Sequence, residues 1–145
     1  MKYTIAFALL AIITLGIASC SNETTSDNMS QLPQSIQNTV ADNFTSNVLS
    51  VTTENNSFGE DEYEIILADG SKIKFEGEAW EEISVPNGQS VPEVFVLEPI
   101  QSYMAQNLPD QTIVKIEKDK KGYEIKLSNG MEIDFDTAGN FVKID

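Results

Sequence analysis

The side chains of this chain that could do chemistry are almost all carboxylates. The sequence has 23 Asp and Glu residues, one cysteine and no histidine, which excludes Ser-His-Asp and Cys-His arrangements and every histidine-based metal site. A carboxylate pair can serve as general acid and base only across a cleft and with separated pKa values. Glu81 and Glu82 are adjacent on an expected strand, so alternation predicts that they point to opposite faces. The sequence therefore predicts a protein that is not an enzyme.

One segment has the opening spacing of a calcium-binding loop. Asp134 and Asp136 begin it, and Asp145 stands at the twelfth position. However, Ala138 replaces an expected oxygen donor, the last position lacks the usual glutamate, and Phe135 suits an apolar core. We therefore expect a strand that runs into a turn here, with no metal site and no cofactor.

The first twenty residues have the pattern of an export signal. Lys2 precedes the apolar run Ile5 to Ile17, which is shorter than the roughly 20 residues that a membrane-spanning helix needs. The run ends in Ile17-Ala18-Ser19-Cys20, which resembles the lipobox of bacterial lipoproteins. The resemblance implies a lipoprotein signal peptide over residues 1–19 and a lipid on Cys20. The alternative is that Cys20 is an ordinary small residue near a signal-peptide cleavage site.

The segment after Cys20 is polar. Residues 20–31 are rich in Ser, Asn, Thr and acidic residues and have Met29 as their one large apolar side chain, so we expect a flexible tether. Asn22 stands where an inner-membrane retention signal would have aspartate, which favours the outer membrane, facing the periplasm or the cell surface.

The net charge limits the class of partner. Loss of Lys2 with the signal peptide would change the formal charge from −14 to −15, which argues against nucleic acid, because phosphate contacts need basic patches. Residues 32–85 hold 11 acids and 2 lysines, whereas residues 96–145 hold 9 and 6. A basic partner would therefore favour the first segment.

The folded part contains a duplicated stretch. Tyr63 to Phe75 recurs sixty residues later as Tyr123 to Phe135. Its alternation predicts a hairpin in each copy, and a three-residue loop ending at Gly70 places Ile65 opposite Ile73 and keeps one face apolar. The other face is charged, so each hairpin should have one buried and one solvated side.

Each duplicated stretch follows a helix candidate. Apolar residues recur at helical spacing in both segments, each with a proline near its start: Leu32, Ile36, Val40 and Phe44 in the first, and Ile100, Tyr103, Met104 and Leu108 in the second. The predicted fold is α+β, with two helix-plus-antiparallel-strand repeats over 32–85 and 96–145, a linker over 86–95, and one larger sheet with the helices on one face. Residues 91–97 could extend the second helix or form a separate short turn or strand.

These motifs resemble the PepSY-like, putative beta-lactamase-inhibitor-like family of envelope proteins. The resemblance rests on Leu32-Pro33, on the two Tyr-Glu-Ile strands with their Asp-Gly or Asn-Gly turns, and on Gly139-Asn140-Phe141. It implies helix-plus-sheet units that form a continuous sheet with an open face. The matching positions are core and turn residues, so the resemblance carries over no site.

Candidate partner-binding residues lie outside these motifs. Phe58 is the one aromatic residue in an acidic loop with Glu60 and Asp61, and it could anchor a partner or fold back onto the sheet. Ile66 is apolar on the charged face, and Trp80 begins the last strand of the first segment, where a core role is the alternative. We expect a lipid-anchored, non-catalytic module that binds a protein or peptide and no small-molecule substrate; the alternative is a structural or calcium-sensing envelope lipoprotein.

Overall fold

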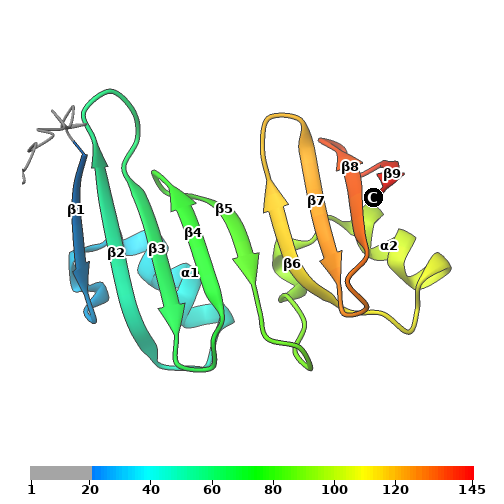
Figure 1. Cartoon of the computed structure of the whole chain (residues 1–145), viewed down its shortest axis with the longest axis horizontal. Coiled ribbons are helices and arrows are strands. Elements are labelled where there is room, and N and C mark those ends of the chain that lie inside the picture. The colour runs from blue at the N-terminus through cyan, green and yellow to red at the C-terminus, as the bar shows by residue number, and fades with distance from the viewer. Residues whose placement is uncertain (1–20) are drawn as a thin grey trace, which may run out of the picture.

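A computed structural model describes residues 21–145, so the predicted signal peptide and Cys20 lie outside the described residues. Nine antiparallel strands form one sheet in the order of the sequence. Two helices, α1 (Gln34–Asn43) and α2 (Glu98–Asn107), lie behind this sheet on the same face (Figure 1). The α+β class, with one large sheet and helices on one face, is therefore confirmed.

The strands follow one another as neighbours across the sheet, and two short 3-10 helices precede the α-helices. The 3-10 helices are η1 (Met29–Gln31) and η2 (Glu93–Phe95). The strands are β1 (Ser21–Ser26), β2 (Val48–Asn56), β3 (Glu62–Leu67), β4 (Lys72–Glu76), β5 (Ala79–Ser84), β6 (Ile113–Lys118), β7 (Gly122–Leu127), β8 (Glu132–Asp136) and β9 (Phe141–Ile144).

The registers of the β3–β4 and β7–β8 hairpins are as predicted. Ile65 lies opposite Ile73, and Ile125 lies opposite Ile133. In the first turn, the Leu67 amide donates to the Ser71 carbonyl, and Gly70 has a φ of 92°. This left-handed conformation suits glycine and allows the three-residue loop. Each hairpin therefore presents this isoleucine pair to the helix side of the sheet.

The helices bury the apolar stripe that their spacing predicts. Ile36 and Val40 of α1 and Ile100 and Met104 of α2 are buried against the sheet. Burying one isoleucine or methionine side chain contributes about 1.5–3 kcal/mol, so this contact holds the helices on the face they cover. None of the helices in residues 21–145 has the length and apolar character that a membrane span requires.

The predicted linker over 86–95 includes part of the core. Val91 and Phe95 are buried, as is the adjacent Val96, and the Val91 amide donates to the Ile113 carbonyl. The segment left open in the sequence, 91–97, forms η2 and the entry to α2. Burying the three apolar side chains of this six-residue segment is more favourable than leaving them exposed in a mobile connection.

The flexible tether predicted over residues 20–31 is wrong for most of its length. Ser21–Ser26 forms β1, which pairs antiparallel with β2 from Ser21 opposite Asn56 to Ser26 opposite Val51. The prediction rested on the missing apolar residues, but an edge strand needs only backbone partners, and β2 offers them along its outer edge.

Candidate functional site

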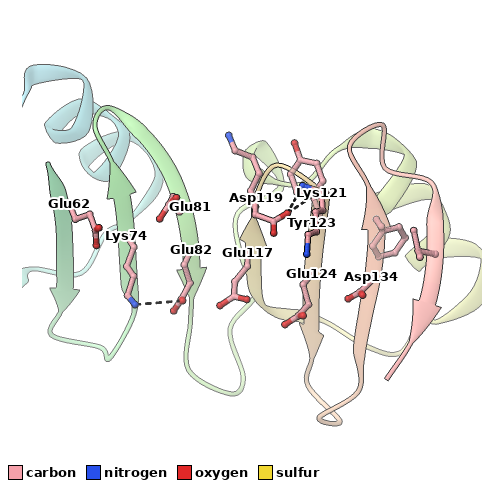
Figure 2. Close-up of a pocket in the computed structure, with 14 residues that line it drawn as sticks. Glu62, Lys74, Glu81, Glu82, Glu117, Asp119, Lys121, Tyr123, Glu124 and Asp134 are labelled. Carbon is pink, nitrogen blue, oxygen red and sulfur yellow. Dashed lines mark hydrogen bonds and ion pairs between the residues drawn. The ribbon is translucent and has the colours of Figure 1, made fainter. Parts of the chain in front are cut away.

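The sheet face that the helices leave uncovered carries a charged row, in which each residue lies directly opposite the next on the neighbouring strand. We call this side the open face. The charged row consists of Glu64, Lys74, Glu82, Glu117, Glu124, Asp134 and Lys143. Its third to sixth members, which form the middle of the row, are all acidic and cross from β5 to β8, and Figure 2 shows them pointing away from the sheet side by side.

The middle of the charged row lines a groove of about 640 Å³ on the open face (Figure 2). The groove extends across the β5–β6 pair, where Glu82 faces Glu117 and Ile83 faces Ile116. Acids outnumber lysines in its lining. A partner that fills this groove would therefore meet carboxylates from both halves of the chain.

A β-bulge in β5 places two adjacent carboxylates on the open face. Lys74 pairs with Glu82 while the next residue, Phe75, pairs with Trp80, so Glu81 has no opposite residue on β4. Glu81 and Glu82 both line the groove, so the prediction that they point to opposite faces is wrong. A bulge inserts one residue into the alternation and turns the following side chains to the other face.

Glu82 is the most enclosed acid of the charged row. Its side chain is 13% exposed, and its carboxylate lies 3.3 Å from Lys72 Nζ, 3.7 Å from Lys115 Nζ and 3.8 Å from Lys74 Nζ. Burial alone would raise its pKa, but a hydrogen bond with Glu117 and the charges of Lys115 and Lys72 outweigh burial and lower the pKa. Glu82 is thus held as an anion by its neighbours.

Two other acids at the groove have the opposite shift. Burial, followed by a hydrogen bond and charge repulsion from Glu76, raises the pKa of Glu81. Burial, followed by repulsion from Glu117 and Asp134, raises the pKa of Glu124. These carboxylates lack enough cationic neighbours, so a basic group brought by a partner would stabilise their charged form.

The predicted binding residues lie at three separate places. Phe58 is fully exposed at the tip of the loop between β2 and β3. In the same loop, the Asn56 amide donates to Asp61 Oδ1, and Asn56 Nδ2 donates to the Glu60 carbonyl. These bonds fold the loop onto its own base, and Phe58 stays exposed without packing on the sheet.

The other two predicted residues lie on opposite faces of the sheet. Ile66 is half-buried on the open face, opposite Ser50 and Lys72. Trp80 is half-buried on the helix side, where its ring packs edge-on against Phe95 at 5.7 Å. The contacts of Trp80 match the core role that the sequence left as an alternative.

The segment with calcium-loop spacing forms a strand end and a turn. Asp136 Oδ1 accepts hydrogen bonds from the amides of Ala138 and Asn140, and bonds from Asn140 lower the pKa of Asp136. Asp134 instead faces the groove, 3.5 Å from Lys143 Nζ. Within residues 21–145, no three acidic or cysteine side chains are placed to hold a metal ion.

The acidic middle of the charged row was not predicted as a unit. The hairpin register predicted for the first copy, carried sixty residues on to the second, places Glu124 opposite Asp134, and the structure confirms this pair. The contact of Glu82 with Glu117 depends on how β5 meets β6, and no repeated pattern in the sequence fixes that register. The spacing of Trp80 and Ile83, two core residues three apart, was the available sign of the bulge.

Solved structures of the same fold come from Bacteroides. A protein from Bacteroides vulgatus ATCC 8482 described as "putative periplasmic protein of unknown function" is 33% identical, with a TM-score of 0.79 over 86% of this chain and 99% of that one. A protein from Bacteroides thetaiotaomicron described as "putative calcium-regulated periplasmic protein" is 35% identical, with a TM-score of 0.77 over 85% and 96%. Among curated proteins, the comparison finds none that matches this chain.

The family resemblance drawn from the turn and strand motifs is confirmed by a match to a family sequence model over residues 61–143. This range covers more than half of the sequence and includes β3 to β8 with the whole groove-forming part of the sheet. The chain belongs to the family described as "Putative beta-lactamase-inhibitor-like, PepSY-like".

Proposed function

We propose that this protein is a non-catalytic binding module of the bacterial envelope that contacts a basic protein or peptide through its open face. The observation that carries the proposal is the acidic groove across the β5–β6 pair, on the one sheet face that the helices leave free. A sheet face with fixed side chains can bind a partner with little loss of conformational freedom. Its negative charge would also speed the approach of a positive surface.

The location in the envelope is part of the same proposal. The similar structures are described as periplasmic proteins, and the sequence around Cys20 resembles a lipobox. We infer a lipid anchor on Cys20 in the outer membrane. Two or more acyl chains, at about 0.8 kcal/mol per buried methylene, would make the attachment lasting.

We also infer that residues 29–85 and 93–144 are copies of one unit. The 3-10 helix, the α-helix and the four strands recur in the same order. The equivalent glutamines even make the same bond: Gln37 Nε2 donates to the Leu32 carbonyl and Gln101 Nε2 to the Val96 carbonyl. Because the groove lies between two such units, substitutions in one unit can change its lining without disturbing the core of the other unit.

The proposal is tested by capture of envelope proteins on residues 21–145, which contain every described element of the fold. The matched pair of variants has equal charge: Glu117→Lys with Glu124→Lys in the groove, and Asp42→Lys with Asp110→Lys, where both acids are exposed and outside the groove. We expect one protein that is retained by the unaltered chain and the control and is lost with the groove variant. Loss with both variants, or with neither, would contradict binding at the groove.

The contribution of the predicted residues is tested with the captured partner. Phe58→Ala with Ile66→Ala should weaken binding about tenfold or more if these side chains are anchors, because anchor residues typically contribute at least 1–2 kcal/mol each. Unchanged affinity would confine the contact to the charged row. The family description also makes beta-lactamases the first hydrolases to assay for inhibition.

A calcium-sensing role is the second candidate function. The specific observation in its favour is the similar structure described as calcium-regulated, together with the raised pKa values of Glu81 and Glu124, which indicate acids short of cations. Millimolar calcium should then raise the melting temperature, and a chelator should reverse the rise. An unchanged melting curve would remove this candidate without affecting the protein-binding proposal.

A further inference from the structure

The last strand of the sheet is an exposed edge with apolar side chains. Within residues 21–145, only one long side of β9 is paired, with β8. Phe141, Val142 and Ile144 are 45%, 55% and 49% exposed. An edge strand that carries free backbone groups and apolar side chains is a template for another strand.

Strand β5 shows what covers an edge of this kind. β5 and β9 have the same register on their inner neighbours: Trp80 and Phe141 lie opposite Phe75 and Phe135, and each strand bulges at the next position. Ile83 of β5 is fully buried, whereas its equivalent in β9, Ile144, is half-exposed. The difference is that β6 pairs with the outer side of β5 through three positions, Glu82 to Ser84.

The equivalent three positions of β9 are self-complementary. They are Lys143 and Ile144 of β9 and Asp145, which directly follows the strand. If two copies of this segment pair antiparallel about a two-fold axis through Ile144, each Ile144 faces its twin on the helix side, as Ile83 faces Ile116 within the chain. On the open face, Lys143 of each copy then faces Asp145 of the other, a pairing of opposite charges.

The other free edge of the sheet is a poor match for β9. β1 is polar along its whole length and is paired with β2 on its inner side, so it offers no apolar partner for Ile144. Pairing of β9 with β1 would also be head-to-tail and would lead to larger rings or open filaments, whereas pairing of β9 with itself closes as a dimer. A lysine usually protects an edge strand from such contacts, but Asp145 would offset Lys143 here.

We propose that this protein forms a two-fold dimer through β9, in which the sheets of two copies join edge to edge. The occupant of the edge is a second copy of this chain. The joined sheet would bring the two open faces onto one continuous surface, so a partner could contact both. The dimer does not depend on what the open face binds.

The test is the mass of residues 21–145 in solution, measured by sedimentation or light scattering over a range of concentrations. We expect a monomer–dimer equilibrium. Ile144→Lys should weaken it by about tenfold or more, because it places two charges where apolar side chains would meet. Leu49→Lys is the matched control, since Leu49 is a 62% exposed strand residue far from β9 in the sheet order, and it should dimerise normally.

Exchanging the two charges distinguishes this strand register from nonspecific association through apolar surface. Lys143→Asp or Asp145→Lys alone would place like charges opposite each other and should weaken the dimer, and the double variant should restore it. Thermal melting of each variant shows whether the monomer stays folded. A monomer at every concentration would overturn the proposal, as would a dimer that is unaffected by Ile144→Lys or not restored by the double exchange.

Discussion

The two halves of this sheet have equivalent cores and different open faces. On the helix side, Ile73 of the first half and Ile133 of the second are both fully buried and lie opposite equivalent residues. On the open face, the bulge of the first half presents Glu81 and then Glu82, whereas the bulge of the second presents Val142 and then Lys143. The core positions are constrained by packing, whereas the open-face positions are constrained by charge pairing, by solubility and by whatever the face binds.

The loops differ in the same way. The β2–β3 loop of the first half is longer and carries Phe58, whereas the β6–β7 loop is tightened by Asp119, whose Oδ1 accepts bonds from the amides of Lys121 and Gly122. Figure 1 shows both loops at the same end of the sheet. The two halves therefore differ in chemistry on the open face and at the loop end of the sheet, whereas their helix sides are alike.

The largest effects should come from matched truncations in the two cores. Ile73→Ala and Ile133→Ala should each lower the free energy of unfolding by about 2–5 kcal/mol, because each leaves a cavity in a packed interior. Urea unfolding measures both. The exposed control Leu49→Ala should change stability by less than about 0.5 kcal/mol. A much smaller loss in one half would show that the two cores are not equivalent.

A smaller effect should separate the two open faces. Glu82→Gln should cost about 1–3 kcal/mol at neutral pH, because it removes a charged partner from three lysines. The folded state lowers the pKa of Glu82, so its contribution is present above the ordinary glutamate pKa and is lost as the pH falls through the lowered value. The difference between variant and unaltered chain should therefore shrink on acidification.

The control for this experiment is the equivalent position in the other half. Lys143 is half-exposed and pairs with surface carboxylates, so Lys143→Gln should have little effect on stability at any pH. Unfolding curves at neutral and acidic pH test both variants. A loss from Glu82→Gln that stays constant with pH would mean that packing, not charge, makes this position important.

The smallest effects should again be equal in the two halves. Gly70 and Gly130 have φ values of 92° and 88° in equivalent turns. Alanine at either position should cost about 1–2 kcal/mol, because a Cβ is strained in the left-handed region, and neither turn would otherwise clash with it. Thermal melting of the two variants should show shifts of similar size. Unequal shifts would indicate that one turn is held by contacts beyond the hairpin.

Much of this fold could be predicted because apolar alternation fixes strand register. The pairing of Ile65 with Ile73 and the stripes of both helices follow from which side chains must be buried. The bulge at Glu81 was missed because alternation was extended through it. Two apolar residues three apart, Trp80 and Ile83, and again Phe141 and Ile144, cannot share a face of a regular strand, so the repeated spacing was the signal.

The candidate site was harder to predict than the fold. The acidic middle of the charged row depends on the β5–β6 pair, and this register is set by a long connection through η2 and α2 and not by a tight turn. β1 was missed because its pairing uses backbone groups and gives no apolar pattern. Polar edge strands and the strand pair that joins the two halves are therefore the features that composition does not reveal.

The pairing of β1 with β2 limits how far the domain could extend from a lipid anchor. Twelve extended residues, as in the tether predicted over 20–31, would let the domain move about 40 Å from an anchor. β1 is paired as far as Ser21, which lies beside Asn56 at the base of the Phe58 loop. A lipid on Cys20 would therefore be joined to the sheet by almost no flexible chain. The loop end of the sheet would then be held close to the bilayer, and only partners that pass near the membrane would meet it.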